Sequence, residues 1–426
     1  MWSRGPWLCA VALAAAAPPA ARASDDAARA SDDAARAADD AARAADDASI
    51  GRALAAALPA DGQSDLLLIE RTSGQATPRV FGATRTAAAP AAIKAALLDA
   101  AHYHALIPAL EGSAVLGPDQ RAPRIDWDLD VPLFDLSGRI ALYDRPDGVT
   151  LELVEGDLSP GRIIFSIAPH PAGGSTLIID AQLDVKRSSW LLRHIMARSP
   201  AGEGAVLAAA AYVALRATAL RGEHPIGASA WRPTAPPGTS RLPDPTPLAA
   251  KSLAPLRARG CLALVARGQS ERLGGVAIAA GFHAPAAALL QRLRDPDSWR
   301  AFPGWRTVRV RAGSNGPGAE VEDNLPLVDF DATWIADPGS TPRWTVAAGA
   351  TRGAHLGWNV FAIGGTPPAP AATPTLAALT LYPRLEATGT VARRFIQAEP
   401  LLEEGLALAL AYTDLVGVGA ALDTPR

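Results

Sequence analysis

The stretch IDWDLDVPLFDLSGRIALYDRPDGVTLELV, residues 125–154, decides the fold. In its first part apolar side chains alternate with aspartates, and this period of two predicts a strand with one apolar and one acidic face. The apolar members of that strand are Ile125, Trp127, Leu129 and Val131. Two more strands are predicted over 136–143 and 149–154, with the turn sequence Arg145-Pro-Asp-Gly148 between them. Strands this close in sequence indicate an antiparallel meander.

On the C-terminal side of this stretch, the strand pattern continues and then gives way to a helix. Strands are predicted over 162–168 and 176–185. Ser188 or its neighbour can cap a long helix over about 190–221, and a kink is expected at Pro200 because proline interrupts the helical hydrogen bonds.

On the N-terminal side, a short strand is predicted over 79–86. A helical segment over 90–107 begins at Pro90, where the missing N–H of proline costs nothing. One strand, short helices, a run of strands and a long final helix make an α+β order.

Two long halves of the sequence match each other. Segment 90–108 matches 285–303, and this alignment places Tyr103 opposite Trp299. The sequence VPLFDL at 131–136 matches LPLVDF at 325–330. The last helices agree at five pairs: Arg193 with Arg393, Pro200 with Pro400, Glu203 with Glu403, Tyr212 with Tyr412 and Leu215 with Leu415. Agreement in three separate, ordered blocks predicts a tandem duplication.

Composition shifts divide the chain into segments. A stretch rich in Pro, Gly, Ser and Thr between the halves predicts an extended linker that leaves the halves without fixed mutual packing. The predicted segments are a signal peptide at 1–23, a spacer at 24–64, a first domain at 65–222, a linker at 223–257, a second and divergent domain at 258–421, and a tail at 422–426.

The N-terminus has the order of a secretory signal. Arg4 precedes the apolar run 8–17, and Ala21-Arg22-Ala23 forms a small-residue cleavage site before Ser24. Cys9 does not lie where a lipoprotein cysteine should, so we expect a soluble exported protein, periplasmic or secreted, rather than a lipid-anchored one.

Residues 24–48 repeat a seven-residue unit built from Asp, Ala and Arg. The unit has no large apolar residue and therefore forms no coiled-coil seam. A solvated spacer, disordered or transiently helical, is favoured over an interaction motif. Farther along, the apolar run 205–215 stops at Arg216 and the run 406–422 carries Asp414, so no transmembrane segment is predicted.

Charge and cysteine content exclude several classes of protein. The chain has 426 residues with 40 Lys+Arg against 43 Asp+Glu, and it has no basic block of the kind that binds nucleic acid. After removal of Cys9 with the leader, Cys261 alone remains, so the mature chain forms no internal disulfide. The oligomeric state stays open.

The order of elements and three motifs resemble the START-like superfamily, also called SRPBCC or helix-grip. The motifs are the segment 90–108, Val131-Pro-Leu-Phe-Asp-Leu-Ser-Gly138 and Ser188-Ser-Trp-Leu-Leu-Arg193. The nearest types are polyketide cyclases and coenzyme Q-binding proteins. The resemblance implies two tandem helix-grip domains, each with a curved antiparallel sheet around a long C-terminal helix and an apolar cavity between them. In the second half Thr388-Gly-Thr390 replaces Ser-Ser-Trp, which departs from the pattern.

Large side chains on strands or on the last helices are the candidates for the cavity lining; they are first of all core residues. In the first domain they are Trp127, Leu129, Phe165, Trp190, Arg193, Met196 and Tyr212. In the second domain they are Trp334, Trp344, Trp358, Arg393, Phe395 and Tyr412. A mostly apolar pocket selects hydrophobic ligands by shape.

No pattern in the sequence predicts a metal, a cofactor or a catalytic residue. Asp126, Asp128 and Asp130 lack the glycine turn and distal glutamate of a calcium loop, and His102 and His104 point to different sides of a helix. Asp135, with its counterpart Asp329, can act as a general base, but a carboxylate there more often closes a turn.

Three functions follow as hypotheses. The leading one is an exported, non-enzymatic protein that binds or carries a lipid or other apolar small molecule, in the first domain alone or in both. The second is an enzyme of the polyketide cyclase/aromatase type that uses Asp135 or a cavity arginine. The third is a ligand-free scaffold for protein interactions. Clustered titratable groups in the cavity favour the enzyme, and an apolar lining favours binding.

Overall fold

A computed structural model gives the arrangement of the chain. It describes residues 41–71, 77–103, 110–116, 123–131, 134–188, 201–224, 242–268, 272–301, 305–313, 316–325, 328–337, 341–349, 351–362, 375–385 and 401–423, together with positions 38, 193, 196, 339 and 396. The chain forms two units. In unit Met1–Ser49 the described residues from 41 onward are helical, and unit Ile50–Arg426 contains all the strands described below.

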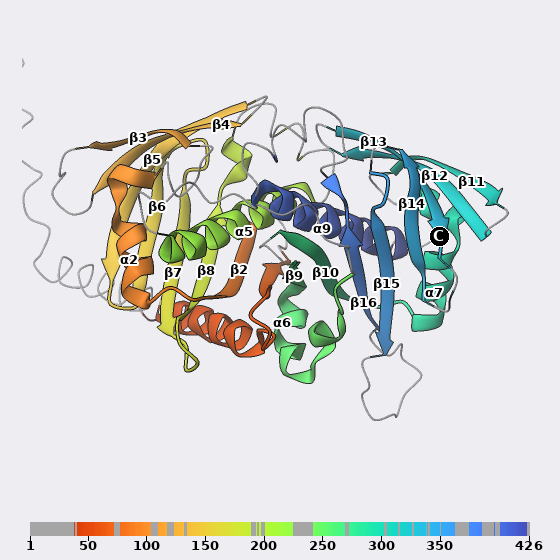
Figure 1. Ribbon diagram of the computed structural model, residues 1–426, viewed down its shortest axis with the longest axis horizontal. Helices are drawn as coiled ribbons and strands as arrows, with labels where there is room; N and C mark the ends of the chain where they lie inside the picture. Colours follow the sequence, from red (N-terminus) through yellow and green to blue (C-terminus); the bar gives the residue numbers. More distant parts are fainter. Residues whose placement is uncertain are drawn as a thin grey trace, which may run out of the picture. The chain divides into compact units, whose positions relative to one another are not determined.

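The first half of the larger unit is a meander of strands closed by a long helix (Figure 1). Its strands are β1 Ser64–Glu70, β2 Arg79–Thr86, β3 Leu110–Leu116, β4 Arg124–Val131, β5 Phe134–Arg145, β6 Gly148–Gly156, β7 Gly161–Pro169 and β8 Ser175–Leu183. Its helices are α2 Pro90–Leu98, the short helices η1 Ala100–His102 and η2 Val185–Arg187, and the long helix α5 Gly202–Glu223.

The second half repeats this order. Its strands are β9 Gly260–Arg267, β10 Leu273–Phe282, β11 Trp305–Gly313, β12 Gly316–Leu325, β13 Val328–Ala336, β14 Arg343–Gly349, β15 His355–Ala362 and β16 Thr375–Tyr382. Its helices are η3 Thr246–Ala249, η4 Lys251–Leu253, α6 Ala254–Arg259, α7 Ala286–Arg294, η6 Pro296–Ala301 and α9 Leu401–Asp423.

The strand order is the same in both halves. It runs β1-β2-β8-β7-β6-β5-β4-β3 in the first half and β9-β10-β16-β15-β14-β13-β12-β11 in the second, with antiparallel neighbours throughout. The predicted fold class is therefore confirmed: the protein is α+β, with two tandem helix-grip domains in which an antiparallel sheet is followed by a long C-terminal helix.

The duplication extends to individual hydrogen bonds. After α2, the Tyr103 hydroxyl donates to the carbonyl of Leu97 at 2.7 Å. After α7, the Trp299 indole N–H donates to the carbonyl of Leu293 at 3.3 Å. In both halves a buried ring thus closes the end of the helix that follows the second strand, as the alignment of Tyr103 with Trp299 leads one to expect.

The two halves share one sheet, because β1 pairs with β9 along its whole length. In the first half Leu66 pairs with Ala83, and in the second half Leu262 pairs with Ala279. These pairs occupy corresponding positions, so Leu67 and Ala263 correspond as well, and they lie directly opposite each other. Antiparallel pairing about equivalent residues is the geometry of a two-fold axis.

This pairing corrects the expectation that the halves lack fixed mutual packing. Helices α5 and α9 also contact each other on one face of the sheet (Figure 1). The C-terminal part of the predicted linker differs from an extended segment, because residues 246–259 form short helices and Leu248 and Leu253 are buried. The predicted domain boundaries themselves stay predictions.

The predicted spacer differs from the structure in its second part. Residues 50–57 are helical, and Ile50, Leu54 and Leu58 are buried in a second apolar cluster against Leu66, Leu68 and Phe81. The reason is that these large apolar residues follow the Asp/Ala/Arg repeat and supply the buried face that the repeat lacks. The long helix predicted over 190–221 is described from Gly202 to Glu223, and Pro200 lies outside the described residues.

Candidate functional site

The interior of the first half lies between the strands and α5 and belongs to the main apolar cluster. Trp127 of β4 and Phe165 of β7 are buried there, as is Met196. Strand β6 contributes three more members of the same cluster: Val149, Leu151 and Leu153. The structure therefore brings three of the predicted cavity residues into one apolar interior.

Trp127 is held in place by a glycine on the neighbouring strand. It pairs with Gly138 of β5, and a Cβ built on Gly138 would lie 3.0 Å from the indole ring and 2.6 Å from the carbonyl oxygen of Glu155. Position 138 therefore has no room for a side chain, and the indole packs on the bare backbone. The Trp127 indole nitrogen is buried and has no hydrogen-bond partner in the part of the chain that the structure describes.

The interior of the second half contains a pair of tryptophans. Trp344 of β14 packs edge-on against Trp299, with ring centroids 4.3 Å apart and an interplanar angle of 70°. Trp358 of β15 is buried in the same cluster. The Trp344 indole nitrogen, like that of Trp127, is buried without a hydrogen-bond partner among the described residues.

Other predicted cavity residues have different environments. Trp334 is half-buried at the edge of the cluster, and Arg193 is exposed. Of Leu129 the structure describes the backbone, which pairs with Leu110 and Leu136. The predicted cavity residues that lie outside the described residues are Trp190, Arg393 and Phe395. Their assignment to a cavity stays a prediction.

Tyr212 belongs to a buried polar cluster at the junction of the halves, which we call the junction cluster. It comprises Asp65 of β1, Thr84 of β2, Tyr212 and Arg216 of α5, Arg267 of β9 and Glu404 of α9. The fully buried Asp65 is its centre: the hydroxyls of Tyr212 and Thr84 donate to its carboxylate, the former at 3.0 Å.

Two arginines compensate the charge of Asp65. Arg216 Nε lies 3.7 Å from one carboxylate oxygen, and Arg267 Nη2 lies 3.6 Å from the other. Arg267 also donates to the carbonyl of Gly62. A buried carboxylate requires such partners, because an isolated charge in the interior is strongly destabilising.

Glu404 completes the junction cluster from the second half. Burial, which penalises the charged carboxylate, raises its pKa from 4.5 to about 7, although Arg216 and a hydrogen bond with Tyr212 act in the opposite direction. One of its oxygens, Oε2, is buried and has no partner among the described residues. The raised pKa of the Tyr212 hydroxyl likewise comes first from burial, then from Glu404 and Asp65.

The two-fold relation gives this cluster a counterpart with different chemistry. Cys261 occupies the position equivalent to Asp65, and Tyr412 that of Tyr212. The Cys261 thiol is buried, and burial raises its pKa to about 11 despite a hydrogen bond from Arg71. It is therefore a neutral thiol at ordinary pH, and it lacks the thiolate character of a catalytic cysteine.

The junction cluster could not be predicted from the spacing of residues in the sequence. Its members come from five elements, and Tyr212 and Asp65 are 147 positions apart, so no local spacing relates them. One signal was available: Asp65 directly precedes the continuous apolar run Leu66-Leu-Leu-Ile69, where a charge would be costly without buried partners.

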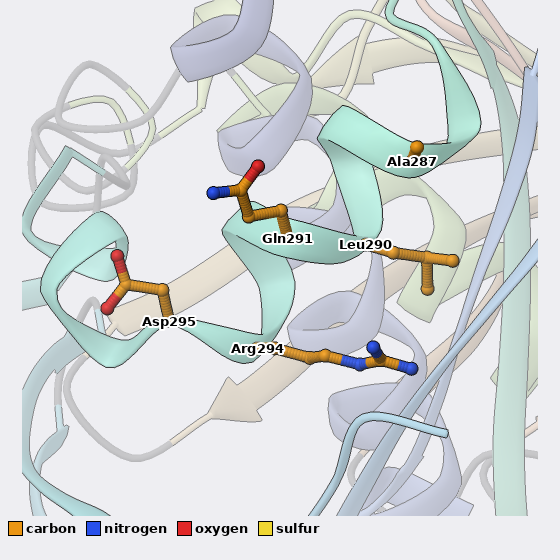
Figure 2. A pocket seen from close by; sticks show the side chains of 5 residues that line it. All are labelled: Ala287, Leu290, Gln291, Arg294 and Asp295. Atoms are coloured by element: carbon orange, nitrogen blue, oxygen red, sulfur yellow. The ribbon is translucent and has the colours of Figure 1, made fainter. Parts of the chain in front are cut away.

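A separate pocket of about 420 Å³ lies along the outer side of α7 (Figure 2). Its lining residues are Ala287, Leu290, Gln291, Arg294 and Asp295. Asp295 is engaged locally, because it accepts hydrogen bonds from the Asp297 N–H and the Ser298 hydroxyl. The buried face of α7, with Leu289 and Leu293, points away from this pocket and into the core.

Asp126 of β4 forms a surface ion pair with Arg139. Arg139 of β5 contacts Asp126 and Glu155, each at 2.8 Å. No group of three or more metal-ligating side chains occurs in the described portion of the chain. Helix α5 has the length and composition of a membrane span, but 72% of its apolar window is buried within the unit.

The chain was compared with known proteins by sequence and by structure. No protein-family model and no curated protein matches the sequence. Among solved structures, a START superfamily protein from Mycobacterium smegmatis is similar, with 20% identity, a TM-score of 0.23, and coverage of 25% of this chain and 76% of that chain. A STAR-related lipid transfer protein from Xanthomonas axonopodis has 15% identity and a TM-score of 0.27, over 39% of this chain and 97% of that one.

The di-domain aromatase/cyclase StfQ from the steffimycin biosynthetic pathway is similar over a longer stretch. It has 10% identity and a TM-score of 0.25, over 79% of this chain and 98% of that chain. At these identities and scores, the fold assignment rests on the strand order and registers of this chain.

Proposed function

We propose that this protein binds or carries an apolar small molecule, such as a lipid, in the interior between sheet and long helix of the first half, and that it does so without catalysing a reaction. The observation that supports this most is where its buried charges lie. Among the described residues, the buried charged side chains are Asp65, Arg216, Arg257, Arg267, Glu403 and Glu404.

These charges lie on β1, α5, α6, β9 and α9, and four of them belong to the junction cluster. On strands β4 to β7, the described side chains that face the interior, among them Trp127 and Phe165, are apolar or aromatic. General acid–base catalysis needs titratable groups within hydrogen-bond reach of the substrate. An apolar interior with few polar groups instead recognises a hydrophobic ligand by its shape.

Export is part of the proposal, and it rests on the sequence alone. A signal peptide over 1–23 would place the mature protein in the periplasm or outside the cell. N-terminal sequencing of protein recovered from the cell envelope should find Ser24 first, whereas an intact Met1 on exported protein would contradict the cleavage.

Binding is tested with the full chain purified from its native envelope. Mass spectrometry of an organic extract should find a stoichiometric apolar molecule, and the emptied protein should bind a fluorescent fatty-acid analogue. Phe165→Leu should weaken that binding several-fold, because it removes apolar surface from the interior.

Tyr143→Leu is the matched control, since Tyr143 is an exposed aromatic residue on β5. Probe affinity that both variants leave unchanged would contradict the interior site. Turnover of a polyketone substrate that Asp135→Asn abolishes would instead establish the cyclase hypothesis.

A further inference from the structure

Two buried indole N–H groups, one in each half, are the starting point. Trp127 is 7% exposed and Trp344 is 2% exposed. Each lies in the main apolar cluster, and the indole nitrogen of each lacks a hydrogen-bond partner among the described residues. In contrast, Trp299 donates to a backbone carbonyl, so the chain satisfies an indole where the structure needs it.

An unsatisfied donor in an apolar interior is costly. Leaving a buried donor without a partner costs about 1–3 kcal/mol, and such groups are rare in native proteins. An indole nitrogen donates and does not accept, so only an acceptor atom can satisfy it. Two such groups of identical chemistry, one on β4 in the first half of the sheet and one on β14 in the second, both in the main apolar cluster, point to a ligand atom as the missing partner.

We propose that each half selects an apolar ligand that carries an acceptor oxygen, such as a ketone, ester or quinone oxygen, and that this oxygen accepts a hydrogen bond from Trp127 in the first half and from Trp344 in the second. This inference rests on the proposed binding function and extends it to the second half. A pure hydrocarbon would leave the donors unpaired and therefore binds more weakly.

Packing holds the indole rings of Trp127 and Trp344, and therefore their N–H donors, in fixed orientations. The Trp127 ring packs on the bare backbone of Gly138, where any side chain would collide with it. The Trp344 ring is fixed in turn by its edge-on contact with Trp299. A donor held in one orientation discriminates between ligands better than a mobile one, because a ligand cannot rearrange it at no cost.

The test compares two probes of the same shape: acetylnaphthalene, a ketone, and isopropenylnaphthalene, in which a methylene group replaces the ketone oxygen. Calorimetric titration of the intact protein gives both dissociation constants. We expect the ketone to bind about tenfold more tightly, which corresponds to 1.4 kcal/mol.

Variants assign the preference to the two residues. Trp127→Phe and Trp344→Phe remove the N–H and keep an aromatic ring, so each should abolish the ketone preference at one site, and any loss of apolar contact should weaken the ketone and the alkene equally. Trp358→Phe is the matched control: Trp358 is a buried tryptophan of the same cluster whose indole nitrogen is not among the unpartnered atoms. It should keep the preference.

The outcomes separate this inference from the function on which it rests. If neither probe binds, the proposed binding function fails. If both probes bind the wild-type protein equally well, the binding function stands and the acceptor inference is overturned without recourse to any variant. A ketone preference that survives in a variant carrying both Trp127→Phe and Trp344→Phe also overturns it.

Discussion

At the residue scale, Glu404 makes stability depend on pH. Its pKa rises from 4.5 to about 7 on folding, so the folded state binds a proton more tightly than the unfolded state. Stabilisation from the proton is therefore full below about pH 4.5 and is lost as the pH rises through 7, with a total of about 3 kcal/mol.

Glu404→Gln imitates the protonated carboxyl group and should remove this contribution to the pH dependence. The variant should gain most over the wild type above pH 7, as measured by urea unfolding between pH 5 and 8. Glu203→Gln is the control, because the Glu203 side chain is 32% exposed and faces Lys186 at the surface. Equal pH profiles for wild type and Glu404→Gln would show that Glu404 is not the titrating group.

Asp65 carries the largest expected single-residue effect. Asp65→Ala leaves Arg216 and Arg267 buried without the carboxylate that compensates them, and breaking a buried ion pair in this way costs about 3–5 kcal/mol. Asp144→Ala removes a surface ion pair with Lys94 in which Asp144 is 60% exposed, and it should cost less than about 1 kcal/mol. Similar denaturation midpoints for the two variants would contradict the structural role of Asp65.

At the scale of elements, Tyr103 closes the end of α2. Tyr103→Phe keeps the ring and removes the hydrogen bond to Leu97, so it should destabilise the protein by about 1 kcal/mol. Tyr143→Phe, at an exposed hydroxyl on β5, should leave the free energy of unfolding unchanged. Chemical denaturation of both variants measures the difference, and no loss in Tyr103→Phe would mean that water replaces the bond.

The elements that can be predicted best from the sequence have one solvent-exposed face or clear turn residues at their ends. Strand β4 is predicted because buried positions alternate with more exposed ones along it, and β5 to β8 are predicted because turn residues separate them. The run Leu66-Leu-Leu-Ile69 in β1 is buried at every position and shows no alternation, so its pattern cannot be told from that of a buried helix segment. Matches in three ordered blocks, one of which places Tyr103 opposite Trp299, predicted the duplication. The junction cluster is built from residues far apart in sequence, and its one local signal was the position of Asp65 before an apolar run.

At the scale of the whole molecule, the shared sheet changes what proteolysis should show. We expect trypsin to cut within the predicted linker 223–257, where Lys251 is exposed. Because β1 pairs with β9 and α5 packs on α9, the two fragments should elute together in native size-exclusion chromatography and separate only in denaturant. Fragments that separate without denaturant would contradict the junction described above.

The pairing of β1 with β9 about Leu67 and Ala263 has a consequence for concentration dependence. Two separate chains that met in this way would form a homodimer, and dilution would dissociate it. Here the peptide chain joins the two faces, so an effective concentration that does not depend on dilution replaces the bulk concentration. The contact between the halves therefore behaves as a unimolecular equilibrium, which holds equally in a dilute extracellular fluid and in a crowded compartment.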